Sequence, residues 1–93
     1  MKDPRMVKLA KQLVRYCVDT QPGERVLIEN TGLQREFVAE LVEQVYAAGA
    51  EPFVQIVDPL VHRAILMNTT DAMLDKMADY DAARMADMQC YIG

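Results

Sequence analysis

Metal catalysis is the first chemistry to weigh, because the 93-residue chain carries 14 acidic side chains. A catalytic zinc site needs three converging His, Cys, Asp or Glu ligands and one open position. The chain has one histidine, His62, and contains neither an HExxH nor a CxxC motif. The sequence therefore predicts no metal ligands in this chain and gives His62 a surface or packing role.

Nucleophilic catalysis finds equally little support. The chain has no serine. Its two cysteines, Cys17 and Cys90, lie beside apolar residues, and neither has a histidine nearby in sequence to act as a base. Both thiols are expected to be buried, as free cysteines usually are. Two cysteines give no disulfide framework, which favours a reducing cytoplasm. No catalytic residue is predicted.

The stretch ENTGLQ is the better candidate for a binding site. Asn30, Thr31 and Gly32 follow a predicted strand, and Asp58 follows the next one. Ligands of open parallel sheets bind beyond the carboxyl ends of the strands, so these four residues form a possible ligand-facing loop. Neither GxGxxG nor the GxxxxGK[ST] phosphate loop is present, so no cofactor-binding residue is assigned. The alternative is that Asn30 or Thr31 simply caps the next helix while Gly32 eases the turn.

The charge distribution limits the classes of partner that the chain can bind. A net charge of -4 and a pI near 4.8 argue against nucleic acid and anionic membranes, which attract positive proteins. The charge is uneven, however. Residues 51–93 hold seven acids and three bases, whereas the first fifteen residues hold five of the ten bases, namely Lys2, Arg5, Lys8, Lys11 and Arg15. This basic segment could meet an acidic neighbour, although a solvated helix face is the simpler interpretation.

The amino terminus lacks the apolar core of a signal peptide, and no window approaches the roughly 18 apolar residues of a membrane span. A cytoplasmic location with no membrane partner is expected.

Hydrophobic periodicity and turn residues predict alternating helices and strands. Asp3 and Pro4 suit the first turn of an amphipathic helix, and Gly49 suits a left-handed helix end. The expected elements are a helix within 3–20, a strand at 25–29, a helix within 30–50, a strand at 51–58, short helices at 60–67 and 71–78, a single turn at 82–86 after Asp81, and a strand at 90–92. This α-β-α-β-α-α-β order predicts one α/β domain over residues 1–93, with a mostly parallel three-stranded sheet and helices on both faces.

Two apolar sets are expected to fill the core. The first lies on one arc of the first helix and comprises Met6, Leu9, Ala10, Leu13, Val14 and Cys17. The second is the methionine-rich carboxyl half, with Met67, Met73, Met77, Met85 and Met88. Core filling is the expected role of these methionines, and a hydrophobic docking surface is the alternative.

Several stretches resemble the M29 metallo-aminopeptidases of the aminopeptidase T and leucyl aminopeptidase type. That family opens with a basic amphipathic helix ending in Leu-Val-x-Tyr, followed by a Pro-Gly-(Asp/Glu)-(Arg/Lys)-Val-Leu-Ile strand entry. The matching residues are Leu13, Val14, Tyr16, Pro22, Gly23, Glu24, Arg25, Val26, Leu27 and Ile28. The stretches AAGAEPFV and MADMQCYIG are similar to two further segments of the family, so the resemblance spans nearly the whole chain.

The resemblance implies an amino-terminal domain, or a fragment, of a longer enzyme that removes amino-terminal residues from peptides. Two divalent metal ions, zinc, cobalt or similar, would be bound in the later catalytic domain by ligands that match no position here. The implied roles of this chain are packing against that carboxyl-terminal catalytic domain, dimer contacts in a homodimer and shaping of the active-site cavity. By itself the chain is expected to be inactive.

Two other functions are compatible with the sequence. One is a flavodoxin-like module that binds a nucleotide or small molecule through Asn30 to Gly32 and Asp58. The other is an interaction domain that docks through the first helix and the methionine-rich half. The apolar ending MQCYIG further predicts a terminal strand with an exposed edge.

Overall fold

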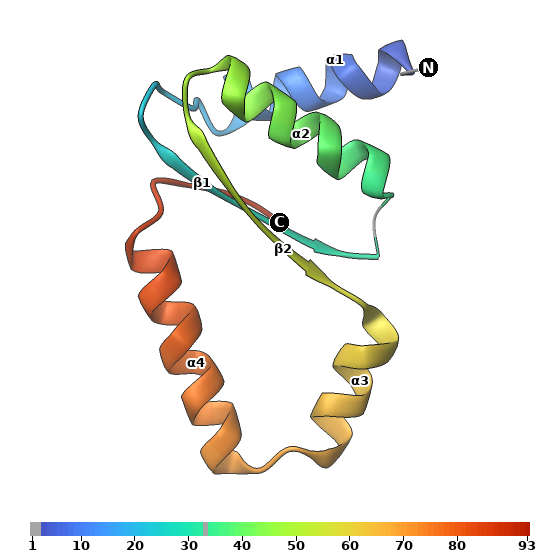
Figure 1. Ribbon diagram of the computed structural model, residues 1–93, viewed down its shortest axis with the longest axis vertical. Helices are drawn as coiled ribbons and strands as arrows, with labels where there is room; N and C mark the ends of the chain where they lie inside the picture. Colours follow the sequence, from blue (N-terminus) through green and yellow to red (C-terminus); the bar gives the residue numbers. More distant parts are fainter. Residues whose placement is uncertain (1–2, 33) are drawn as a thin grey trace.

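A computed structural model describes residues 3–32 and 34–93, so Lys2 of the basic segment lies outside the described residues. Its elements follow the expected order (Figure 1). They are α1 (Pro4–Gln12), a π-helical turn η1 (Leu13–Cys17), β1 (Arg25–Thr31), α2 (Arg35–Ala47), β2 (Glu51–Val57), α3 (Pro59–Asn68), α4 (Asp71–Ala86) and β3 (Cys90–Ile92).

The three strands form one parallel sheet in the order β2-β1-β3. The apolar triplet Val26 to Ile28 places β1 in the centre, as its burial on both faces requires. In Figure 1, α1 and α2 lie on one side of the sheet, and α3 and α4 extend from the other side. Since β1 to β2 and β2 to β3 run in opposite directions across the sheet, right-handed crossovers place their helices on opposite faces. The predicted fold class is confirmed.

One hydrophobic core lies between the sheet and the first two helices. Ala10 and Val14 from the first helical segment, and Leu41 and Val45 from α2, pack with Val26 and other strand residues of the same face. Leu41 is only 2 % exposed. Each large side chain of this kind contributes roughly 1.5–3 kcal/mol by burial, so this layer carries most of the stability of the fold.

The first helix differs from expectation at its end. Asp3 caps it as predicted, with its Oδ1 accepting a hydrogen bond from the Arg5 amide at 2.9 Å. After Gln12 the helix widens into the π turn, where the Val18 amide donates a hydrogen bond to the Leu13 carbonyl. This change of pitch rotates the last turn, so Cys17 is exposed and the prediction of its burial is wrong. Leu9 is also half-exposed, because α2 covers only a narrow stripe of α1.

The start of α2 corrects a second expectation. Asn30 and Thr31 belong to β1 and do not cap the helix, whose N-cap residue is Gln34. The parallel pairing with β2 extends through Thr31 and keeps both residues extended. The predicted helix end at Gly49 is confirmed, with a left-handed φ of +79°. A Cβ there would also lie 3.4 Å from the Pro22 ring. Both the left-handed backbone and the close approach of Pro22 therefore favour glycine at this position.

The second half of the chain forms two helices that project from the sheet. Asp58 caps α3, its Oδ1 accepting hydrogen bonds from the Leu60 and Val61 amides at 2.8 and 3.2 Å. Residues 71–86 form one continuous helix rather than a helix and a separate turn, because Asp81 pairs with Arg84 along the helix instead of capping a new one. Alanines in this region favour helix continuation.

No residue of α3 or α4 is buried. Met67, Met73 and Met85 are exposed, so the prediction that they fill the core of this chain is wrong, whereas Met77 and Met88 are half-buried. Among the helices that the structure describes, none combines the length and apolarity needed to span a bilayer.

The unequal cover of the two sheet faces predicts unequal mutational costs. Leu41→Ala should lower the free energy of unfolding by about 2–5 kcal/mol, because it leaves a cavity in the core. Leu60→Ala on α3 should change it by less than about 0.5 kcal/mol, since Leu60 is 77 % exposed. Urea unfolding followed by circular dichroism measures both. Equal losses for the two variants would contradict a core confined to the α1–α2 side.

Candidate functional site

A hollow lies where the carboxyl ends of β1 and β2 meet α3 and α4. It has a volume of about 610 Å³. Polar lining comes from Glu29, Thr31, Gln55, Asp58, His62 and Asp81, and apolar lining from Ile56, Val57, Val61, Ile65 and Met77. The hollow occupies the edge at which ligands of parallel sheets bind, so it is the candidate site.

The structure brings together three of the four residues predicted to face a ligand. Thr31 and Asp58 line the hollow, and Gly32 lies beside the first turn of α3, where its Cβ position is 3.6 Å from the Pro59 ring. Asn30 does not line the hollow. It is buried on the opposite face of the sheet, the face that α1 and α2 cover, because side chains alternate along β1.

Each carboxylate of the hollow already has a partner in this chain. Glu29 Oε2 accepts a hydrogen bond from the Tyr91 hydroxyl at 2.9 Å. Asp58 caps α3, and Asp81 pairs with the Arg84 guanidinium at 3.1 Å. The first contact joins β3 to β1, the second caps the start of α3, and the third lies within α4. We therefore assign the three carboxylates structural roles.

The hydrogen bond to Glu29 also affects Tyr91. It raises the pKa of the Tyr91 hydroxyl above its usual value, with smaller contributions from desolvation and the Glu29 charge. The phenol thus remains a neutral donor throughout the ordinary pH range, which keeps the β1–β3 contact intact.

The acidic lining disfavours an anionic ligand. A nucleotide or phosphate would face Glu29, Asp58 and Asp81, with Arg84 already held by Asp81 and Gln55. Although the strand order matches the first three strands of a flavodoxin-like sheet, the electrostatics of the hollow do not suit phosphate. A divalent metal finds no site either, because no group of three His, Cys, Asp or Glu side chains converges within residues 3–32 and 34–93.

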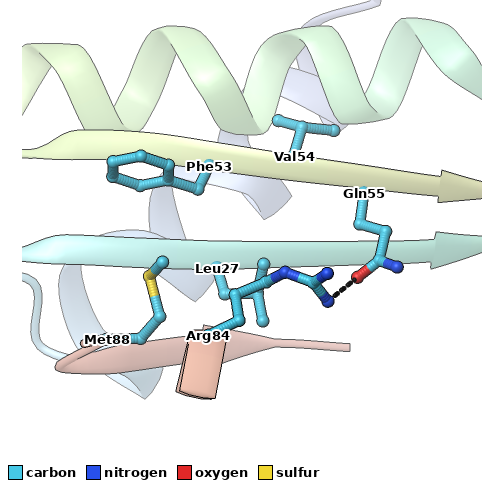
Figure 2. Close-up of a pocket in the computed structure, with 6 residues that line it drawn as sticks. All are labelled: Leu27, Phe53, Val54, Gln55, Arg84 and Met88. Carbon is cyan, nitrogen blue, oxygen red and sulfur yellow. Dashed lines mark hydrogen bonds between the residues drawn. The ribbon is translucent and has the colours of Figure 1, made fainter. Parts of the chain in front are cut away.

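Beside the hollow, the sheet face turned toward α4 has an apolar floor. Figure 2 shows Leu27 and Phe53 on neighbouring strands with Met88 beside them, and the Arg84 guanidinium bonded to Gln55. That bond is 2.7 Å long and ties α4 to β2. Leu27 is 1 % exposed, whereas Phe53 is 40 % exposed, because α4 covers only the centre of the sheet.

The second cysteine lies at the junction of β3 and the loop before β1. The Cys90 thiol lies 3.6 Å from both the Val18 carbonyl and Glu24 Oε1, and 3.9 Å from the Thr20 hydroxyl. Burial raises the pKa of this thiol, the Glu24 carboxylate raises it further, and the Thr20 hydrogen bond opposes the shift. Cys90 is therefore a packing residue and a weak nucleophile at neutral pH.

Sequence reasoning missed Glu29, Gln55 and Arg84 as residues of this region. Alternation along the strands could have placed Glu29 and Gln55 on one face, since their spacing from Leu27 and Phe53 is two residues. Arg84 reaches Gln55 because α4 continues to Ala86. The sequence analysis expected a new helical turn after Asp81 and therefore did not predict this contact.

The two cysteines should react at different rates. Iodoacetamide at pH 8 should alkylate exposed Cys17 first, because Cys90 is partly buried and has a raised pKa. Mass spectrometry of peptides taken at successive times measures both rates. Single variants Cys17→Ala and Cys90→Ala serve as controls for the assignment. Faster labelling of Cys90 in the folded chain would contradict the described environment.

Comparison with known proteins gives one family. A search of curated proteins finds no match. The family model described as thermophilic metalloprotease (M29) matches residues 2–91, which covers nearly the whole chain, from α1 into β3. The chain therefore belongs to the M29 family of metalloproteases.

Proposed function

We propose that this chain is the amino-terminal α/β domain of a cytoplasmic metal-dependent aminopeptidase, and that it docks on a carboxyl-terminal catalytic domain through α3, α4 and the sheet face beside them. The family match supports a metallopeptidase parent. The observation that carries the docking role is an apolar helix, α3, that this chain leaves uncovered.

Apolar side chains surround α3 instead of forming one stripe. Val61 and Ile65 face the hollow, whereas Leu60 and Met67 point away from it and are 77 % and 71 % exposed. A helix that is hydrophobic all round is normally buried. Burying an exposed Leu or Met contributes roughly 1.5–3 kcal/mol, so a partner that covers α3 gains substantial binding energy.

The neighbouring sheet face also carries apolar side chains that this chain leaves largely uncovered. Phe53, Leu27 and Tyr91 lie side by side across β2, β1 and β3, and only Leu27 is buried. Parallel sheets are normally covered on both faces. Together with α3 and the exposed methionines of α4, this row forms one apolar region on the side opposite α1 and α2.

The proposed division of labour assigns the chemistry to the catalytic domain. There two divalent metal ions would activate water for attack on the first peptide bond. The sheet of this chain orients α3 and α4. These two helices would form one side of the cavity in front of the catalytic domain. By itself the chain should not hydrolyse peptides.

The docking role can be tested with Leu60→Glu combined with Met67→Glu. In the intact peptidase, two buried charges at the domain contact should reduce soluble, active enzyme at least about tenfold. In the isolated chain, the same pair should leave the free energy of unfolding within about 0.5 kcal/mol of the wild type, since both side chains are exposed.

Tyr16→Glu is the matched control, because Tyr16 is as exposed as Leu60 but lies on the α1 side. It should retain activity. The isolated chain should also show no cleavage of leucyl p-nitroanilide with added zinc or cobalt. Full activity of the Leu60/Met67 variant, or chelator-sensitive cleavage by the isolated chain, would refute the proposal.

A further inference from the structure

Helix α1 and the π turn after it carry a row of positive charge that the proposed docking role does not use. The basic row consists of Arg5, Lys8, Lys11 and Arg15, and all four side chains are exposed. Spacings of three and four residues place these side chains along one side of the helix. Residues 4–18 contain no acidic side chain, so the row has no counter-charge within its own helix.

The described part of the chain leaves the basic row without ion pairs, since no carboxylate there pairs with any of its four side chains. Arg15 donates a hydrogen bond to the Ala47 carbonyl at 3.1 Å, which leaves other N–H groups of its guanidinium available. Lys8 has a like charge three residues away on either side, and such pairs destabilise a helix. An anionic partner would relieve this repulsion.

An apolar groove adjoins the amino-terminal end of the basic row. It lies between α1 and the start of α2 and has a volume of about 390 Å³. Its lining residues are Asp3, Arg5, Met6, Leu9, Gln34 and Phe37. Leu9 is 50 % exposed, so the groove offers apolar surface directly beside the charge of Arg5. A buried apolar anchor next to a charged rim is the usual composition of a protein-binding surface.

The length of the basic row limits the size of the partner. Ten residues separate Arg5 from Arg15, which corresponds to about 15 Å at a helical rise of 1.5 Å per residue. The acidic residues nearest to the row in sequence, Asp3 and Asp19, lie beyond its two ends. An extended peptide rises about 3.3 Å per residue, so a segment of roughly four or five residues covers the row.

The rest of the molecule disfavours larger anionic partners. Ala10 and Val14 are fully buried in the core, so the apolar side of this helical segment is not available for insertion into a bilayer. The net charge of -4 repels a long polyanion such as nucleic acid wherever it extends beyond the row. A short acidic segment avoids both obstacles.

We infer that the basic row binds a short acidic segment of another protein, with an apolar side chain of that segment in the groove at Met6, Leu9 and Phe37. The contact lies on α1, η1 and the start of α2, away from Leu60 and Met67 of α3. The inference therefore does not rest on the docking role proposed above. Because the charges are exposed, the binding should be weak and strongly dependent on salt.

Fluorescence anisotropy with the 93-residue chain tests this contact. The probe is the acetylated peptide Phe-Glu-Glu-Glu-Glu-Glu, labelled at its carboxyl end, and Phe-Lys-Lys-Lys-Lys-Lys is its counterpart. In about 0.15 M NaCl the chain should bind the glutamate peptide saturably and should not bind the lysine peptide. About 1 M NaCl should weaken the binding at least about tenfold, because the screening length shortens to about 3 Å. Amide shifts in NMR spectra should concentrate in α1, η1 and the start of α2.

Charge reversal separates the basic row from the net charge. Lys8→Glu/Lys11→Glu should weaken binding of the glutamate peptide at least about tenfold and should bind the lysine peptide instead, because two attractions become repulsions. Arg63→Glu/Lys76→Glu makes the same change in net charge on exposed positions of α3 and α4. This control should bind the glutamate peptide within about threefold of the wild type and should not gain the lysine peptide, because it lies beyond the screening length of about 8 Å. Circular dichroism verifies that both variants are folded.

Several results would overturn the inference. They are the absence of saturable binding up to about 1 mM glutamate peptide, equal binding by the α1 variant and the wild type, or amide shifts centred on α3. Tighter binding of single-stranded RNA or of anionic vesicles to the same row would assign it to a different class of partner. Self-association of the chain that Lys8→Glu/Lys11→Glu abolishes would assign the row to a second copy and would equally contradict the proposal.

Discussion

The structure depends on the need to cover both faces of a central parallel strand. Val26 and Ile28 of β1 face α1 and α2, whereas Leu27 faces the other side. A parallel sheet cannot leave either face in water without losing much of its hydrophobic stabilisation. The chain meets this requirement fully on one side, with a layer of two helices, and on the other side only at the centre of the sheet, where Arg84 and Met88 cover Leu27.

This unequal cover explains the different character of the two halves. The first half has a buried core and an outer surface of charges, as an independent α/β layer would. The second half places apolar side chains on every side of α3 and keeps its polar groups for local contacts, such as the Asp58 cap and the Asp81–Arg84 pair. The docking role that we propose would explain this asymmetry, because a catalytic domain of the parent peptidase would then cover the open face.

Local chemistry made much of the fold predictable. Proline after a capping aspartate stands at two helix starts, and Gly49 marked a helix end. Features that depend on distant contacts were less predictable. The π turn exposed Cys17, pairing with β2 kept Asn30 in β1, and the continuity of α4 brought Arg84 to Gln55. At the site, the rule that neighbouring strands end at one edge correctly predicted that Thr31 and Asp58 lie close together. The hydrogen-bond partners of the carboxylates could not be predicted from sequence spacing.

Hydrogen exchange of the isolated chain, followed by mass spectrometry, tests the unequal cover most directly. Amides of β1 and α2 should open only with global unfolding, because their side chains form the core. Amides of α3 and α4 should exchange far faster, at rates set by local opening, since neither helix has a buried residue. Equal protection of α3 and α2 would contradict the account, because it would mean that this chain already covers the face we assign to a partner.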